Sequence, residues 1–492
     1  MFRTVTPEQV GISSALGEKF IRTFNKRGLA MHSVLLMRGE DIFAEYYWKP
    51  FNKDFCHRMY SQTKSFVGVA IGLLEEDGKL CLNDPISKYF PEKIDRELPE
   101  YLRELTIRDM LTMETCGNTP SWFTNEDPDR AHLYFAQNTA YIPGGMRWEY
   151  DSPGSQVLSM LVEKLSGTTL FDFLNERVFK KLGTFKTASI LKTRTEDSFG
   201  DSALLCTTRD MASFARFVMN YGTWHGERLL NEAYLRKATS RIVDNNSMGF
   251  DGVYTQGYGY QIWRVDYNGF AFNGMGGQLT LCFPDLDLIF TCTGDNQGFS
   301  EAKSLILTAL YDLIVENMGD APLPEDQQAY ARCCALGEEL ELIHLSGRAN
   351  SPYAETVNGR VYRCGENPTG ITQFSLHFTG KDTGELHYTN AQGDKVLPFG
   401  LGKNVFTKFP EYGYSNEHAG LRTTDGFLYN CAVSAAWREE KKLCIKAQII
   451  DKYFGNMLMM LSFKDERAVV VMTKTAEDFL DKYAGTFNAR CE

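Results

Sequence analysis

Two different hydrophobic periodicities divide this chain, and they constrain its fold more than any other feature. Between about residues 61 and 246, apolar side chains recur mainly at helical spacing. From about residue 349 they alternate with polar neighbours, as Phe374, Leu376 and Phe378 do. Helices repeat every 3.6 residues and strands every two, so one uniform architecture cannot serve both parts. The sequence therefore predicts two domains of different class.

A boundary lies in the turn-rich segment 320–326, which is followed by an amphipathic helical pattern near 327–342. We expect a first domain at residues 1–318, a linker with a helix at 319–348, and a second domain at 349–492. A chain of 492 residues is long for one globular domain and suits two.

The first domain combines strand signals at its two ends with helical signals between them. An opening helix, a hairpin, a long helical stretch, further strands and a closing helix are expected in that order. This order predicts an α/β (α+β) fold, an antiparallel sheet flanked by helices with a helical subdomain. The principal segments are 7–26, 32–38, 42–48, 61–76, 105–112, 155–165, 170–178, 208–220, 259–265, 278–283, 286–293 and 300–317.

The second domain shows alternating apolar residues in several short segments separated by glycines, including 443–449, 457–463 and 468–473. Such a pattern predicts an all-β barrel or sandwich, and a short helix is expected at 476–483. It is either a stabilising appendage or, through a loop such as 406–414, a roof over a catalytic cleft.

The charge balance and the cysteine content limit the classes of partner and the compartment that the sequence favours. The chain holds 52 Lys and Arg against 63 Asp and Glu, a net charge of −11, which disfavours nucleic acid and anionic membranes. No apolar run approaches the roughly 20 residues of a membrane span, and the first residues show no signal peptide. Twelve cysteines without a CxxC motif are typical of reduced thiols in a cytoplasmic protein. No ligand cluster for a metal is apparent, and no cofactor is expected.

The sharpest local feature is Ser61-Gln-Thr-Lys64, at the head of an apolar helical run. Residues three apart lie on one helix face, so Lys64 would sit beside the Ser61 hydroxyl and accept or relay its proton. The free N–H groups of the first helical turn favour a developing oxyanion. Alone the motif is weak, because two other Ser-x-x-Lys tetrads begin at Ser189 and Ser300 and many helices are simply capped by serine.

Two further segments add chemistry. Tyr150 and Ser152 lie in the Gly- and Pro-rich stretch 143–154 before a helix, where a tyrosine near an ammonium group can serve as general base. The glycine-rich stretch 272–278 precedes a strand pair. Glycines there allow close approach of a substrate and suit an oxyanion hole, although a bulge or tight turn explains them equally well.

Taken in order, these motifs resemble the serine β-lactamase and penicillin-binding-protein-like hydrolases, particularly the branch with class C β-lactamases, esterases and D-aminopeptidases. The resemblance spans roughly residues 7–317. Its landmarks are Ser61-Gln-Thr-Lys64, the segment 105–112, the loop from Pro143 to Ser152, the segment 207–210, Gly257-Tyr-Gly-Tyr260 and Gly274-Met-Gly-Gly-Gln278. The β module after residue 350 is similar to the lipocalin-like barrel of some of these hydrolases.

The resemblance implies a role for each motif residue. Ser61 would be the acylated nucleophile, Lys64 and Tyr150 would activate it, and Ser152 would be the polar third member of the tyrosine motif. Which of Lys64 and Tyr150 accepts the proton in each step stays open. The implied reaction is hydrolysis of a small ester, amide or peptide, including D-residues, through an acyl-Ser61 intermediate without a metal.

The backbone N–H groups of Ser61 and of either Met275 or Gln278 would form the oxyanion hole. The third family motif, usually Lys-Thr-Gly or His-x-Gly, aligns with Phe272-Asn273-Gly274 or with the glycine-rich run that begins at Met275. In both alignments a cation is absent, which disfavours β-lactamase activity, since phenylalanine or methionine cannot pair with a carboxylate.

Arg147 and Arg264 are candidates to supply this charge from elsewhere in the chain. Two alternatives to an esterase or peptidase stay open: the chain is a weak β-lactamase, or it is a catalytically silent penicillin-binding-like protein that only binds a ligand. A homo-oligomer is compatible with the sequence.

Overall fold

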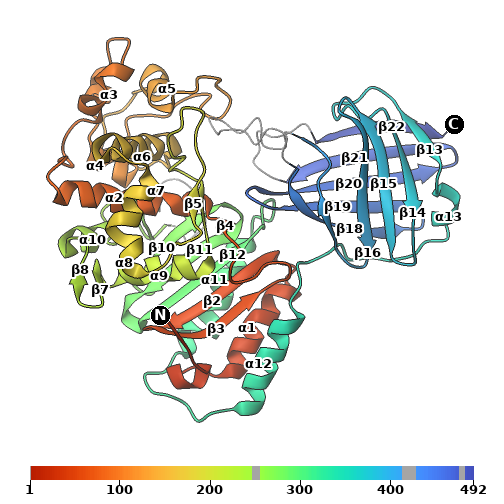
Figure 1. Cartoon of the computed structure of the whole chain (residues 1–492), viewed down its shortest axis with the longest axis horizontal. Helices are drawn as coiled ribbons and strands as arrows, with labels where there is room; N and C mark the ends of the chain where they lie inside the picture. Colours follow the sequence, from red (N-terminus) through yellow and green to blue (C-terminus); the bar gives the residue numbers. More distant parts are fainter. Residues whose placement is uncertain (1, 247–254, 413–427, 476–482, 492) are drawn as a thin grey trace. The chain divides into compact units, whose positions relative to one another are not determined.

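The computed structural model describes the chain except residues 1, 247–254, 413–427, 476–482 and 492. It consists of two compact units, which divide between Glu341 and Leu342 (Figure 1). Each unit is described separately below.

A seven-stranded sheet forms the centre of the first unit. Its order is β1-β3-β2-β12-β11-β10-β9, and all neighbours are antiparallel except β1 and β3. The pairing of β2 with β12 joins strands from the two ends of the unit, as the sequence predicts for an antiparallel sheet. The strands are β1 (Arg3–Thr4), β2 (Met31–Arg38), β3 (Asp41–Tyr47), β9 (Trp263–Val265), β10 (Gly269–Gly274), β11 (Gln278–Phe283) and β12 (Leu288–Gly294).

Helices cover both faces of this sheet, which confirms the expected fold class. On one face, residues such as Phe20 and Leu310 pack with Phe290 in a single buried cluster. On the other, Phe214 packs with Phe66 and Phe272 in a second cluster. The first face carries α1 (Ser14–Lys26), α11 (Ala302–Leu313) and α12 (Gln327–Glu339), and the second carries α9 (Thr208–Met219) and α2 (Thr63–Glu76).

The helical subdomain surrounds α2. Twelve of the fourteen residues of α2 are buried, so this helix is apolar on all sides and lies within the core. The other helices here are α3 (Glu100–Glu104), α4 (Ile107–Thr112), α5 (Arg130–Gln137), α6 (Ser152–Ser166), α7 (Leu170–Leu174), α8 (Lys180–Leu182) and α10 (Glu232–Ala238). Small two- and three-stranded sheets complete the unit: β4 (His57–Arg58), β5 (Ser189–Ile190) and β6 (Leu204–Cys206), then β7 (Thr223–Trp224) and β8 (Glu227–Arg228).

The helix expected in a linker belongs structurally to the first unit. Cys333 of α12 donates to the Ser14 carbonyl over 3.1 Å, and Arg332 forms an ion pair with Glu18 of α1. Residues 319–348 are therefore not a free connector, because their helix packs on α1 and the units divide only after Glu341.

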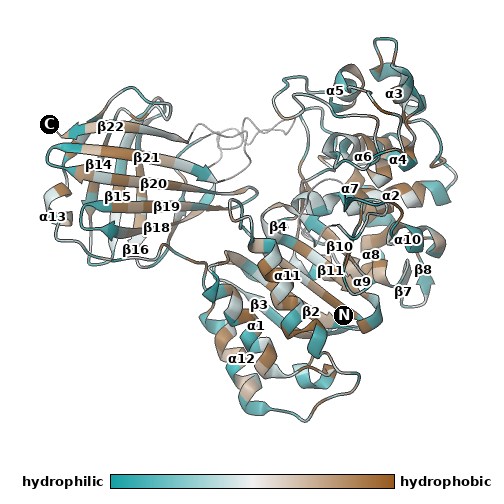
Figure 2. Ribbon diagram, turned by 180° about the vertical axis from the view of Figure 1, so that it is seen from behind, coloured by the Kyte–Doolittle hydropathy of each residue, from teal (hydrophilic) through white to brown (hydrophobic). Residues whose placement is uncertain are grey.

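The second unit is an all-β barrel. Its strand order is β16-β15-β14-β13-β22-β21-β20-β19-β18-β17, and a parallel pairing of β16 with β18 closes it. Side chains such as Phe374, Trp437 and Leu461 are buried, so its own residues fill the interior. In Figure 2 the middles of β20 and β21 are hydrophobic and their ends hydrophilic.

The bounds of its elements are α13 (Ala354–Val357), β13 (Val361–Cys364), β14 (Gln373–Phe378), β15 (Thr383–Asn390), β16 (Gly393–Leu401), β17 (Val405–Lys408), β18 (Asn430–Glu439), β19 (Lys442–Ile450), β20 (Phe454–Lys464), β21 (Arg467–Thr475) and β22 (Gly485–Cys491). The helix expected at 476–483 lies, except for its last residue, outside the described residues, as do residues 413 and 414 of the suggested roof loop.

Candidate active site

Ser61 lies in a single 3₁₀ turn, Tyr60–Gln62, that leads directly into α2. Tyr60 has φ 48°, a left-handed conformation that is costly for a bulky residue and typical of functional turns. The turn is held from both sides, since the Thr63 hydroxyl donates to the Tyr60 carbonyl over 2.6 Å and accepts from the Leu204 N–H over 3.1 Å. The Ser61 hydroxyl is thereby fixed at the start of a buried helix.

Lys64 points at Ser61, as the helical spacing predicts. Its Nζ lies 3.1 Å from Ser61 Oγ and donates a second hydrogen bond to the Asp201 carbonyl over 2.7 Å. The lysine is only 2% exposed. An amine held this close and away from bulk water is placed to exchange a proton with the hydroxyl.

Tyr150 reaches the same place from the loop before α6. The Lys64 Nζ lies 5.1 Å from the centroid of the tyrosine ring. The ring stacks on Trp263 with centroids 5.8 Å apart and is also close to Trp148. The structure thus brings together all three residues that the sequence predicts as catalytic.

Asp151, next to Tyr150, was not among the residues that the sequence singled out. It caps α6, since its carboxylate accepts from the Gly154 N–H over 3.1 Å. Burial raises its pKa from 3.8 to about 6, against the opposing effects of the Gly154 hydrogen bond and the Lys64 charge. The sequence could have indicated the capping role of this carboxylate, because an aspartate directly before Ser-Pro-Gly is a typical residue at the start of a helix. Ser152 is half-buried at the first position of α6 and makes no hydrogen bond to Ser61, Lys64 or Tyr150 within the described structure.

The glycine-rich segment forms the end of β10 and the turn to β11. Gly274 lies against the chain just before Ser61, because a Cβ built on it would be 2.3 Å from the Met59 carbonyl oxygen. No side chain can occupy that position without moving the backbone. The close approach places the turn beside the Ser61 segment.

Hydrogen bonds from neighbouring residues hold the turn of residues 275–277 in place. Gly276 and Gly277 have φ 78° and 97°, and Met275 is half-buried. The Gln278 side chain is fully buried; its amide nitrogen donates to the Met275 and Gly294 carbonyls over 2.6 and 2.9 Å, and its oxygen accepts from the Gly294 N–H over 2.9 Å. Asn296 adds a backbone hydrogen bond to the Gly276 carbonyl over 2.9 Å.

Phe272 and Asn273 of this segment point to different surroundings. Phe272 is buried against Phe214 and Phe270, so it brings no charge to the site. Asn273 accepts a hydrogen bond from Lys303 of α11 over 2.7 Å. Burial lowers the pKa of Lys303 to about 8.

The cation nearest this motif is therefore one that the sequence did not indicate. Of the two candidates considered, Arg147 pairs with Glu149 and Tyr141 on the surface, and Arg264 donates to the Thr239 carbonyl and to Asn268. Lys303 is the lysine of the Ser-x-x-Lys tetrad that begins at Ser300. That tetrad could not be distinguished from a chance match in the sequence.

In the described residues, no group of three or more His, Cys, Asp or Glu side chains is placed to hold a metal ion. None of the described helices has the length and apolar character needed to cross a membrane.

Comparisons with known proteins agree with this geometry. The family model described as Beta-lactamase matches residues 18–303. The 6-aminohexanoate-dimer hydrolase of Paenarthrobacter ureafaciens is 26% identical over 247 residues, which are 46% of this chain and 63% of that protein, so the match spans less than two thirds of the relative.

Two solved structures show the same fold. A putative 6-aminohexanoate-dimer hydrolase from Bacillus anthracis aligns with a TM-score of 0.54 and 15% identity, over 66% of this chain and 89% of that one. A penicillin-binding protein homologue from Caulobacter crescentus aligns with a TM-score of 0.51 and 17% identity, over 63% of this chain and 99% of that one.

Proposed function

The chain belongs to the Beta-lactamase family, and on that premise we propose that it is a serine hydrolase that cleaves small amides or esters through an acyl-Ser61 intermediate. The observation that carries this proposal is the 3.1 Å contact between Lys64 Nζ and Ser61 Oγ, with the Tyr150 ring beside the same ammonium group. These contacts support roles for Ser61 as nucleophile and for Lys64 and Tyr150 as its activating pair.

The reaction proceeds in two steps. Ser61 Oγ attacks the substrate carbonyl carbon while its proton passes to the Lys64–Tyr150 pair, and the same proton then goes to the departing alcohol or amine. Water next attacks the acyl-enzyme, gives one proton to the pair, and releases the acid as Ser61 recovers its hydrogen. The chemistry needs one shuttled proton and no other reactant.

The oxyanion formed in each step needs donors on the opposite side of the carbonyl from the base. We assign this role to the backbone N–H groups of Ser61 and Met275, because Gly274 brings the turn against the Ser61 segment. The Gln278 side chain makes three hydrogen bonds to the Met275 and Gly294 backbone, which support the position of the Met275 donor.

Short linear amides are the favoured substrates, by analogy with the 6-aminohexanoate dimer in the name of the P. ureafaciens relative. In either alignment of the third motif a neutral side chain, Phe272 or Met275, stands where related enzymes carry a cation, which disfavours penicillin-like carboxylates. None of the cysteines in the described residues forms a disulfide, which supports our further proposal of a reducing compartment, the cytoplasm.

A serine-directed phosphonate probe and a hydrolysis panel test this function. The panel comprises an activated ester, the linear dimer of 6-aminohexanoate, a D-aminoacyl amide and a cephalosporin. We expect labelling at Ser61 and hydrolysis of the ester and an amide, with both lost in Ser61→Ala and retained in Ser189→Ala, the exposed serine of another tetrad. Folded protein that takes up no probe and cleaves nothing would instead be a silent binding protein.

A further inference from the structure

Four basic residues form a row across the outer face of the barrel. Lys464 of β20 is the register partner of Arg467 of β21, which faces Arg490 of β22, which in turn faces Arg363 of β13. We call these four residues the basic row. They come from three separate parts of the sequence, so only the barrel register brings them side by side.

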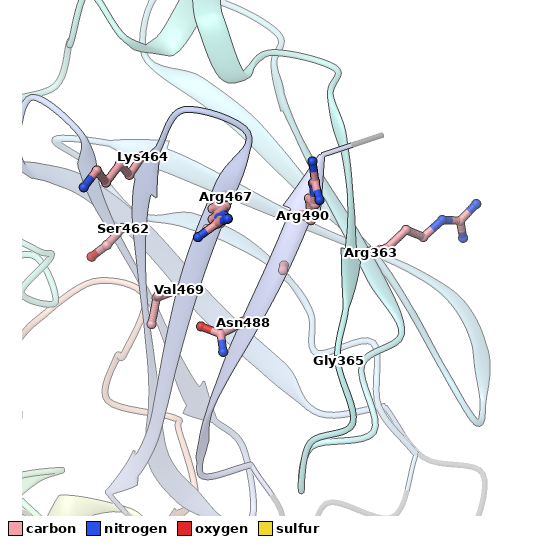
Figure 3. Close-up of a pocket in the computed structure, with 10 residues that line it drawn as sticks. Arg363, Gly365, Ser462, Lys464, Arg467, Val469, Asn488 and Arg490 are labelled. Carbon is pink, nitrogen blue, oxygen red and sulfur yellow. The ribbon is translucent and has the colours of Figure 1, made fainter.

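A hollow with a volume of about 580 Å³ lies over this face. Besides the basic row it is lined by Ser462, Val469 and Asn488, which follow one another across the strands in the same register. Figure 3 shows Arg467 and Arg490 in the middle, Lys464 at one end, and Arg363 at the other end with its side chain turned outward. A serine hydroxyl and an asparagine amide therefore accompany the cations.

Like charges lie directly opposite one another along the basic row. Like charges directly opposite on neighbouring strands destabilise a sheet. Lys464 and Arg467 form no ion pair within the described part of the chain, and Arg490 meets Glu466 at 3.4 Å with both side chains mostly exposed. Arg363 donates to Gln373.

General basicity of the barrel does not explain the basic row. Residues 342–492 hold 18 Lys and Arg against 17 Asp and Glu, and the whole chain has a net charge of −11. The four residues form three successive pairs of like charges, which is a local concentration of positive charge in an almost neutral unit. Their mutual repulsion is relieved if an anion binds among them.

We propose that the basic row is a binding site for a small soluble ligand that carries several phosphate groups. Guanidinium groups match phosphate oxygens with paired hydrogen bonds, and neighbouring strands place the outer members of the row about 14 Å apart, the reach of a short chain of phosphates. The net negative charge of the chain would repel a large polyanion or an anionic lipid surface. This repulsion favours a small ligand. This inference does not depend on the hydrolase function.

Titration of the full-length protein with sodium tripolyphosphate, followed by calorimetry in metal-free buffer, tests the site. We expect saturable one-to-one binding that weakens as salt increases. Arg467→Gln and Arg490→Gln should each raise Kd about tenfold, since each removes a charge-assisted contact. Glu466→Gln should lower Kd about threefold, because it removes a competing carboxylate. Lys381→Gln, an exposed cation of the same unit outside the row, is the matched control.

Circular dichroism and thermal unfolding establish that each variant retains the barrel. The proposal is overturned if wild type shows no saturable binding, or if Lys381→Gln weakens binding as much as Arg467→Gln. Vesicles of phosphatidylcholine with phosphatidylserine form a separate arm. Binding to these vesicles that needs Arg467, without binding of tripolyphosphate, would assign the basic row to a membrane surface and also reject the proposal.

Discussion

The two units place their charged groups differently, although the barrel also buries a carboxylate, Glu411, and a lysine, Lys395. Residues 1–341 hold 34 Lys and Arg against 46 Asp and Glu, yet this acidic unit buries a lysine, Lys64, beside Ser61, and a carboxylate, Asp151, within reach of the Lys64 charge. The nearly neutral barrel fills its interior mainly with apolar side chains such as Trp437 and Leu461, and concentrates cations on its outer face. Burial of a charge is costly, so it persists where surrounding groups hold it for a purpose.

This difference assigns hydrolysis to the buried polar groups of the first unit and ligand binding to the surface of the second. Variants that affect hydrolysis should therefore be those of the first unit, and equivalent changes in the barrel should affect stability or ligand binding only.

Lys64→Met should have the largest effect. It keeps the shape of the buried side chain but removes the amine at 3.1 Å from Ser61, and loss of a general base lowers rates by about 10²–10⁴. We expect kcat for an activated ester to fall about 10³-fold while the variant keeps the wild-type structure. Lys192→Met, at a half-buried lysine of another Ser-x-x-Lys tetrad, is the control and should keep the wild-type rate. Comparable rates in Lys64→Met and wild type would remove Lys64 from the mechanism.

Gln278→Ala should come next, because it removes the brace behind the turn that bears Met275. We expect kcat to fall about 10- to 100-fold with KM less affected, and the free energy of unfolding to fall by about 1–3 kcal/mol from unpaired backbone groups. The rate is measured with the ester and the stability by urea unfolding.

The barrel offers a matched control for this change. Gln448 is also buried, and its amide donates to the Ile343 carbonyl over 2.8 Å. Gln448→Ala should lose stability by a similar amount but keep kcat. If both variants lose kcat equally, the effect of Gln278→Ala reflects general destabilisation and the turn has no special role.

These contrasts also show which features a sequence can reveal. The contact of Ser61 with Lys64 follows from helical spacing alone, and β11 was predicted at its observed bounds, 278–283. Tyr150 could be assigned only through the order of motifs that resembles a family, since no local rule brings a loop 86 residues away to Lys64.

The remaining features depend on tertiary packing. Strand β10 was missed because glycines and aromatic residues in Gly269–Gly274 obscure its alternation. Lys303 of α11 donates to Asn273 of β10. The packing that brings these two elements together cannot be recognised from any pattern in the sequence. The amphipathic pattern near 327–342 predicted α12, but not that it packs on α1.

Asp151→Asn should reveal a pH-dependent effect on stability. The pKa of Asp151 is about 6 in the folded protein and 3.8 when unfolded, so the folded state binds the proton more tightly. The stabilisation from this proton is fully present below about pH 4 and is lost as pH rises through 6. Relative to Asp151→Asn, which keeps a capping side chain, wild type should lose up to about 3 kcal/mol between pH 4 and 7.

Urea unfolding at pH 4, 5, 6 and 7 measures this difference. Asp394→Asn, an exposed carboxylate of the barrel, provides the comparison and should give a nearly constant difference from wild type over the same range. A difference for Asp151→Asn that does not change with pH would mean that the buried carboxylate titrates as it does in the unfolded chain.

Arg467→Gln should have the smallest effect on hydrolysis. The basic row contains none of the groups that contact Ser61, and an exposed cation exerts no net attraction on a neutral ester. We therefore expect kcat/KM for the activated ester to stay within twofold of wild type in the same preparation in which tripolyphosphate binding weakens tenfold. A loss of fivefold or more, with the barrel intact by circular dichroism, would mean that the second unit takes part in hydrolysis, and the division between buried chemistry and surface binding would fail.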